Sequence, residues 1–246
     1  MKNIVMLILV LSSFLQAKTI TIAVAANVSY AIEDLKIAFH KLHPDVSVKV
    51  ILGSSGKLTA QIKRGAPYEL FMSANMKYPN ALHVDKLAIT TPIVYAKGSL
   101  AFLSSKKRDF SSMQKLLKSK DIKKIAIPNP KTAPYGKAAF EALKNANLLK
   151  VLKKKFVYGE SVSQTVAYTV SATDIGLIAK SALYSPKMTK FKKDIHWQNI
   201  DTKFYTPIKQ GIVLLKNSSK EARYFYDFIL SNKAKSIFKT YGYILP

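Results

Sequence analysis

Four short segments of the sequence place small and polar residues where an extended run passes into a helical pattern. They are Ala25-Ala26-Asn27, Gly53-Ser54-Ser55-Gly56, Thr132-Ala133-Pro134-Tyr135-Gly136 and Gly159-Glu160-Ser161-Val162. The first turn of a helix exposes backbone N–H groups without partners, together with the positive end of the helix dipole. Such a helix start can bind an anion without a charged side chain. Four of them directed at one point would form a cage for an oxyanion.

The same residues have an ordinary structural explanation. Serine, asparagine and glycine are frequent caps and turn residues at helix starts. Any one segment taken alone is therefore best explained as a cap. The anion-binding interpretation depends on the agreement of all four segments, two in each half of the chain.

The elements that must position these segments follow an α/β pattern. Strands are predicted at residues 20–25, 46–52, 69–73, 122–127, 156–158 and 175–179, and helices at 28–42, 57–64, 134–144, 162–170 and 220–241. Two long extended segments, 92–104 and 205–215, interrupt the alternation. This layout predicts two α/β units joined by two extended crossings, with the loops at the carboxyl ends of the strands facing a cleft.

The charge of the chain is strongly positive. Lysine and arginine number 39 against 14 aspartate and glutamate, which gives a formal net charge of +25. This balance favours anionic partners. The lysines are scattered rather than gathered in an arm, and the densest run, Lys153-Lys154-Lys155, is predicted to be a solvated helix end. No nucleic-acid-binding motif is present, and we expect no nucleic-acid partner.

The residues that usually hold metals are few in this chain. There is no cysteine, which excludes disulfides, a lipid-modified N-terminal cysteine and thiolate metal sites. The four histidines, His40, His43, His83 and His196, are too widely spaced to form a recognised metal motif. We therefore expect neither a metal site nor a cofactor.

The N-terminus has the features of a secretory signal peptide. Met1-Lys2 precedes an apolar run over residues 4–15, and a small residue stands at Ala17. The run is shorter than the roughly 20 residues that span a bilayer. We expect cleavage near Ala17, before Lys18, and a periplasmic location for the mature chain.

The order of five segments resembles the periplasmic molybdate-binding proteins, the soluble receptors of molybdate ABC importers. The segments are AVAAN, GSSGKLTAQIKRGAPYELFMSA, PNPKTAPYGKAAFEAL, GESVSQTVAYTVSATDIGLI and FYDFILSNKAKSIFKTYGY. The most specific of them runs from Gly53 to Ala74. The resemblance implies a two-lobed periplasmic binding protein fold with two crossover strands, of the type II kind. Lobe 1 would comprise 18–95 plus 206–246, and lobe 2 would comprise 96–205.

The resemblance also implies a set of ligand-binding residues. Asn27 falls at the polar position after the first strand, and Ser55 at a serine that donates from both its hydroxyl and its amide. Tyr135 and Val162 fall at positions that donate through backbone N–H groups, and Ala26 adjoins the first position. One departure is Ala179, where some members carry a tyrosine that completes the cage.

The implied function is that of a receptor rather than an enzyme. It would bind molybdate, or also tungstate, between its lobes and deliver it to an inner-membrane ABC permease, acting as a monomer. Two alternatives remain open: the same fold tuned to sulfate or a small carboxylate, and a basic surface protein or adhesin that binds polyanions.

Overall fold

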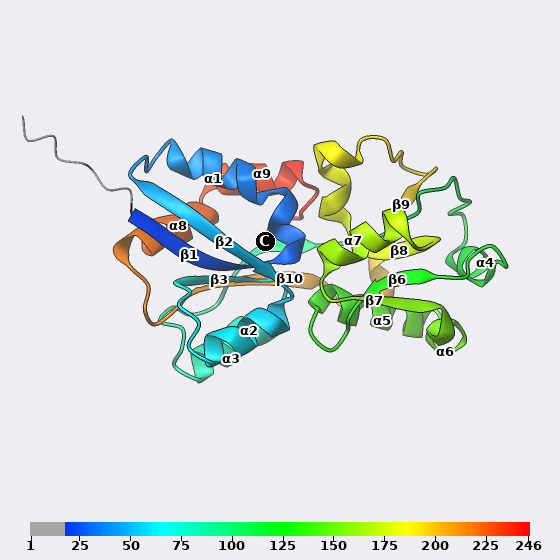
Figure 1. Cartoon of the computed structure of the whole chain (residues 1–246), viewed down its shortest axis with the longest axis horizontal. Helices are drawn as coiled ribbons and strands as arrows, with labels where there is room; N and C mark the ends of the chain where they lie inside the picture. Colours follow the sequence, from blue (N-terminus) through cyan, green and yellow to red (C-terminus); the bar gives the residue numbers. More distant parts are fainter. Residues whose placement is uncertain (1–17) are drawn as a thin grey trace, which may run out of the picture.

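The structure is a computed structural model that describes residues 18–246. The signal peptide predicted for residues 1–17 lies outside the described residues. Two five-stranded sheets lie side by side along the long axis of the molecule, each with helices on both faces (Figure 1). We call the first sheet with its helices lobe 1 and the second sheet with its helices lobe 2.

Lobe 1 is built on the strand order β2-β1-β3-β10-β4. The strands are β1 (Lys18–Ala25), β2 (Val46–Gly53), β3 (Leu70–Ser73), β4 (Ile93–Gly98) and β10 (Ile208–Leu214). Strand β1 is parallel to both β2 and β3, whereas β10 is antiparallel to β3 and β4. Parallel strands therefore carry their carboxyl ends, and the loops that follow them, to one edge of the sheet.

Both faces of the first sheet are covered by helices, because alternate residues of each strand point to opposite faces. Ile22 and Val24 face α1 (Ile32–His40), α8 (Lys220–Leu230) and α9 (Asn232–Thr240). Ala23 belongs to a second cluster, with residues of α2 (Ser55–Lys63) and α3 (Lys77–Val84). Burial on both faces explains why these strands read as nearly continuous apolar runs.

Lobe 2 repeats this plan with the strand order β7-β6-β8-β5-β9. The strands are β5 (Leu100–Leu103), β6 (Ile125–Pro128), β7 (Phe156–Gly159), β8 (Ile175–Ala179) and β9 (Trp197–Asn199). Helices α4 (Met113–Lys118) and α5 (Pro134–Asn145) pack on one face, with α6 (Leu149–Leu152) after α5, and α7 (Val162–Ser171) packs on the other. Strand β6 is parallel to β7 and β8.

The chain crosses between the lobes twice. The first crossing runs from β4 to β5 through Ser99, and the second returns through Tyr205 to β10. The two crossings touch, because the Leu100 N–H donates to the Tyr205 hydroxyl at 3.1 Å. The extended segments predicted at 92–104 and 205–215 contain these crossings, and the predicted two-lobed α/β fold is confirmed.

Several predicted elements differ in detail. The helix expected at 28–42 begins as a 3-10 turn, η1 (Ala26–Tyr30), before α1 starts. The helix expected at 220–241 is divided at Ser231, whose hydroxyl accepts from the Ala234 N–H and so caps α9. Helix α3 was not predicted; Pro79 lies in its first turn, where a helix tolerates proline.

The lysine run Lys153–Lys155 forms a short 3-10 turn, η2, at the end of α6 and buries none of its residues. The predicted solvated helix end is therefore confirmed. Within residues 18–246, no helix has the length and apolar character needed to cross a membrane.

Candidate oxyanion site

The four segments singled out in the sequence meet where the two lobes touch. They contribute most of the lining of a small cavity, whose residues are Ala25, Ala26, Asn27, Gly53, Ser54, Ser55, Ala74, Ala133, Pro134, Tyr135 and Val162. The cavity is small, with a volume of about 10 Å³, which is roughly the room that one water-sized group needs. The two lobes therefore lie close together around it.

The start of α2 leaves two hydroxyls available. The Ser55 hydroxyl oxygen accepts from the Ala74 N–H at 2.9 Å, which leaves its own hydrogen free to donate. Ser54 is the N-cap of α2, yet its side chain makes no capping hydrogen bond. Its hydroxyl oxygen is buried and has no protein partner among the described residues. Ser54 was not among the predicted ligand residues, although it belongs to the segment Gly53-Ser54-Ser55-Gly56.

The start of α5 also lacks a side-chain cap. Its N-cap is Ala133, which has no side-chain acceptor, and Pro134 occupies the first turn. Because proline has no N–H, the amide of Tyr135 is the first donor that this helix can offer. The Tyr135 hydroxyl lies away from the cavity, against Gly98 at the first crossing, where an added Cβ would be 2.0 Å from it.

The start of α7 is capped in the ordinary way. The Ser161 hydroxyl oxygen accepts from the Gln164 N–H at 3.3 Å. Capping therefore explains Ser161, whereas it does not explain Ser54. Val162, the first residue of α7, is buried and lines the cavity.

Asn27 lies in the cavity wall with 1% of its surface exposed. Its side-chain nitrogen donates to Gln210 Oε1 and to the Tyr243 hydroxyl, both at 2.8 Å. Its side-chain oxygen is buried and has no partner among the described residues. Both N–H bonds of the amide are thus engaged inside the protein. Gln210 and Tyr243 gave no sequence signal, since they are 183 and 216 residues away from Asn27.

The last two positions singled out in the sequence, Ala26 and Ala179, are both alanines, and only the first lies in the cavity wall. Ala26 lines the cavity at the start of η1. Ala179 is fully buried at the end of β8, where it pairs with Leu100, and it is not among the lining residues.

The cavity wall carries no charged side chain. Glu160, whose direction the sequence left open, forms an ion pair with Lys57 outside the cavity, and this pair joins the two lobes. Burial raises the pKa of Tyr243 to about 12 and holds the pKa of Tyr135 well above its usual value. Both hydroxyls therefore stay protonated at neutral pH, and the site is electrically neutral.

Direct contacts close the lobes around the cavity. The Gly56 N–H donates to the Thr132 carbonyl oxygen at 2.9 Å. On another side, the Ser181 hydroxyl donates to the Asn27 carbonyl oxygen at 3.0 Å. Ala25, Ala26 and Ala74 from lobe 1 share one apolar cluster with lobe 2. The structure is therefore a closed form.

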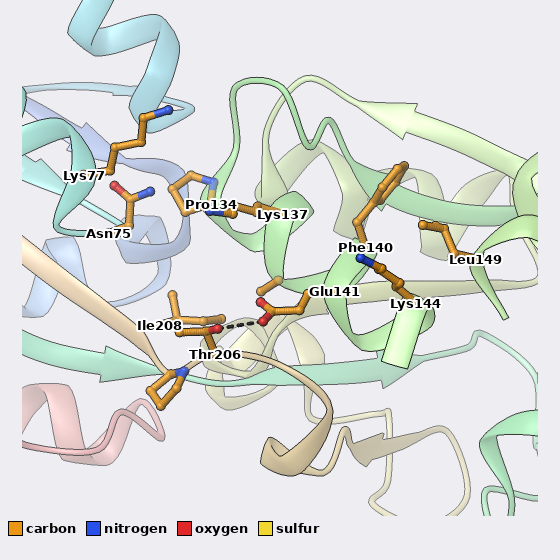
Figure 2. A pocket seen from close by; sticks show the side chains of 12 residues that line it. Asn75, Lys77, Pro134, Lys137, Phe140, Glu141, Lys144, Leu149, Thr206 and Ile208 are labelled. Atoms are coloured by element: carbon orange, nitrogen blue, oxygen red, sulfur yellow. Dashed lines mark hydrogen bonds between the residues drawn. The ribbon is translucent and has the colours of Figure 1, made fainter. Parts of the chain in front are cut away.

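A larger groove of about 510 Å³ lies beside this site and is bordered by both lobes and the second crossing (Figure 2). It contains Lys77, Lys137 and Lys144, and also Glu141, which accepts from the Thr206 hydroxyl at 2.6 Å. The groove is open, contains a carboxylate and is too large for a small oxyanion. In residues 18–246 no group of three or more histidine, aspartate or glutamate side chains could hold a metal ion.

Comparison with known proteins finds molybdate-binding proteins among the relatives of this chain. The molybdate-binding protein ModA of Azotobacter vinelandii is 32% identical over 93% of this chain and 90% of its own length. That of Rhodobacter capsulatus is 32% identical over 90% of this chain and 86% of its own. A structure of the periplasmic molybdate-binding protein from Azotobacter vinelandii superimposes with a TM-score of 0.84, covering 92% of this chain and 99% of that one.

A more distant structure shares the fold alone. The sulfate-binding protein SubI of Mycobacterium tuberculosis H37Rv has a TM-score of 0.75 at 13% identity, covering 92% of this chain and 86% of that one. The family described as bacterial extracellular solute-binding protein matches residues 20–244. With this match over nearly the whole described chain, the protein belongs to the bacterial extracellular solute-binding proteins, whose place is outside the cytoplasm.

Proposed function

We propose that this protein is the periplasmic receptor of an ABC importer, which binds molybdate, or also tungstate, between its lobes and delivers it to a membrane permease. The observation that carries the proposal is the neutral cavity at the lobe junction, where helix starts converge with the Ser54 hydroxyl, which has no partner in the part of the chain that the structure describes. The relatives named for molybdate binding support the same ligand. We propose Ala26, Asn27, Ser55, Tyr135 and Val162 as ligand residues, and we add Ser54.

The chemistry of the cavity fits a tetrahedral dianion. A fully deprotonated oxyanion only accepts hydrogen bonds, so a wall rich in donors stabilises it. The hydroxyls of Ser54 and Ser55 and the amides at the starts of α2, α5 and α7 can supply such donors. The helix dipoles add positive potential without a formal charge. No carboxylate in the wall could instead accept a hydrogen bond from a protonated phosphate.

The ligand itself is tested by calorimetric titration with molybdate, tungstate, sulfate and phosphate in parallel. We expect tight binding of molybdate and tungstate and weak binding of the other two. Tight sulfate binding without molybdate binding would support the first alternative, a lobe pair tuned to another anion. Because no lining side chain titrates near neutrality, molybdate affinity should be constant between about pH 6 and 9.

The alternative of a polyanion-binding surface protein predicts a different response to salt. Exposed lysines interact with polyanions through charges that salt screens, and their binding weakens steeply as counterions compete. A ligand enclosed between lobes is screened much less. Molybdate affinity that changes little between low and moderate salt therefore favours the receptor, and heparin binding without molybdate binding would favour the alternative.

A further inference from the structure

A buried polar network lies directly behind Asn27. Besides Asn27 it contains Gln210 on β10, Tyr95 on β4, Tyr135 on α5 and Tyr243 near the C-terminus. Each has at most 4% of its surface exposed. The network therefore joins a wall of the cavity in lobe 1 to the first turn of α5 in lobe 2.

The hydrogen bonds of this network have a defined direction. Asn27 Nδ2 donates to Gln210 Oε1 at 2.8 Å, and the Tyr95 hydroxyl donates to the same oxygen at 2.9 Å. Gln210 Nε2 donates to the Tyr135 hydroxyl at 3.4 Å. Asn27 Nδ2 also donates to the Tyr243 hydroxyl, which in turn donates to the Asn27 carbonyl oxygen at 2.9 Å. Asn27 Oδ1 has no hydrogen-bond partner among the described residues.

This direction is unsuited to a dianion. A buried carbonyl oxygen without a partner is unusual in a native protein. An oxyanion beside it would meet a second acceptor, and two acceptors without a hydrogen between them repel each other. We call this arrangement the acceptor state of Asn27.

The same side-chain positions admit a second arrangement. If the amides of Asn27 and Gln210 both rotate by half a turn, their oxygen and nitrogen atoms exchange places. Gln210 Nε2 then donates to Asn27 Oδ1 and to the Tyr95 hydroxyl, while Gln210 Oε1 accepts from Tyr135. A phenolic hydroxyl can donate or accept. In this arrangement the Tyr95 hydroxyl changes from donor to acceptor, and the Tyr243 hydroxyl donates to Asn27 Oδ1 instead of to the Asn27 carbonyl oxygen, which still accepts from the Ser181 hydroxyl. Asn27 Nδ2 is released to donate to a ligand, and we call this the donor state.

We propose that Gln210 is a positioning residue for the ligand site, and that its amide rotates together with that of Asn27 when an unprotonated oxyanion enters the cavity. This inference rests on the proposed function. It also bears on specificity, because the acceptor state suits a ligand that carries an O–H, such as hydrogen phosphate. The donor state suits molybdate or sulfate.

Two matched phenylalanine variants separate the states, because an unpaired buried N–H is more costly than an oxygen that keeps another donor. In Tyr95→Phe, Gln210 Oε1 still accepts from Asn27 in the acceptor state, but Gln210 Nε2 loses an acceptor in the donor state. In Tyr243→Phe, an Asn27 N–H loses its acceptor in the acceptor state, whereas Asn27 Oδ1 still accepts from Gln210 in the donor state. The two variants should therefore shift the equilibrium in opposite directions.

The measurements are calorimetric titration with molybdate and thermal unfolding without ligand. We expect Tyr95→Phe to weaken molybdate binding about tenfold with little change in melting temperature. Its ratio of molybdate to phosphate affinity should fall. We expect Tyr243→Phe to lower the ligand-free melting temperature and to tighten molybdate binding a few-fold, since it removes part of the preference for the acceptor state.

Nuclear magnetic resonance observes the rotation itself in the wild-type protein. In the free protein the Asn27 side-chain N–H protons should show Overhauser contacts to the Tyr243 ring, and in the molybdate complex the Gln210 side-chain protons should show contacts to the Tyr95 ring. Unchanged contacts on binding, or equal weakening of binding in both variants, would overturn the amide rotation while leaving the receptor function intact. Absence of oxyanion binding by the wild-type protein would overturn both.

Discussion

The backbone N–H of Gly56 in lobe 1 donates a hydrogen bond of 2.9 Å to the carbonyl oxygen of Thr132 in lobe 2. Gly56 stands in the first turn of α2, and Thr132 stands just before α5. Two helix starts that border the cavity are thus joined to each other directly. A Cβ atom built on Gly56 would lie 2.7 Å from the Tyr78 hydroxyl of lobe 1, 2.9 Å from the Thr132 carbonyl oxygen and 3.1 Å from the Thr132 Cα.

The first prediction follows from this contact. Gly56→Ala should weaken molybdate binding about tenfold or more by calorimetry, because the methyl group keeps the lobes from closing fully. The ligand-free melting temperature should change little, because alanine is a better helix former than glycine and the Tyr78 hydroxyl, at the free end of its side chain, can move aside. Ala60→Gly, at an exposed position of the same helix, is the control for helix propensity. It should lower the melting temperature and leave affinity unchanged. Equal affinity of Gly56→Ala and wild type would contradict the role of this contact.

The second prediction separates the two serines of the α2 start. Ser55→Ala should weaken molybdate binding roughly ten- to a hundredfold, because hydrogen bonds to charged groups contribute about 1.5–3 kcal/mol. It should also destabilise the ligand-free protein, because the buried Ala74 N–H loses its acceptor. Ser54→Ala should weaken binding without destabilising the free protein, because the Ser54 hydroxyl has no hydrogen-bond partner within residues 18–246. Thermal unfolding with and without ligand measures both effects. A Ser54→Ala variant that loses stability and keeps its affinity would mark Ser54 as purely structural.

The third prediction concerns the ion pair of Lys57 and Glu160 that joins the lobes. Replacing both residues with glutamine keeps the net charge and removes the pair. Both side chains are more than half exposed. The pair should therefore contribute at most about 1 kcal/mol, or roughly fivefold in affinity, and the difference should vanish at about 1 M salt. Lys63 and Asp85 pair within lobe 1 at 2.6 Å, and the same double replacement there should not change affinity. A loss of affinity much greater than roughly fivefold that persists at about 1 M salt would show that the pair does more than hold the lobes together.

The fourth prediction is a loss of stability at alkaline pH. Tyr243 has its pKa raised by burial to about 12, whereas an unfolded tyrosine ionises near its ordinary value of 10.0. Below pH 10 Tyr243 keeps its proton in both the folded and the unfolded state, so its ionisation does not lower the free energy of unfolding. Between pH 10 and 12 only the unfolded state releases it, so the free energy of unfolding should fall by roughly 2–3 kcal/mol from this residue. Urea unfolding at several pH values measures the slope, and Tyr243→Phe should make it less steep. An identical slope in the variant would exclude Tyr243 as the cause.

The fifth prediction concerns the two crossings through Ser99 and Tyr205. If the chain bends there, the ligand-free protein in solution includes open forms, and molybdate shifts it towards the closed form described above. Small-angle scattering should show a smaller radius of gyration when molybdate is bound. Identical scattering profiles at a molybdate concentration that calorimetry proves saturating would exclude hinge closure.

Much of the architecture follows from local sequence patterns. The strand at 175–179 and the start of α5 at Pro134 were predicted at their observed positions, because apolar runs and proline act on the backbone near them. The four polar helix starts were also visible in the sequence, and their convergence follows from the rule that the loops after parallel strands lie at one edge of a sheet.

The tertiary structure alone decided how these residues are used. In the structure Ser161 caps α7, and the Asn27 amide donates to Gln210 and Tyr243. The Ser54 hydroxyl has no partner among residues 18–246. Local periodicity places a residue on an element, but the hydrogen-bond partner of a buried side chain depends on which distant segments pack against it. Asn27 and Tyr243 are 216 residues apart, and only the folding of the C-terminal segment onto lobe 1 brings them within 2.8 Å.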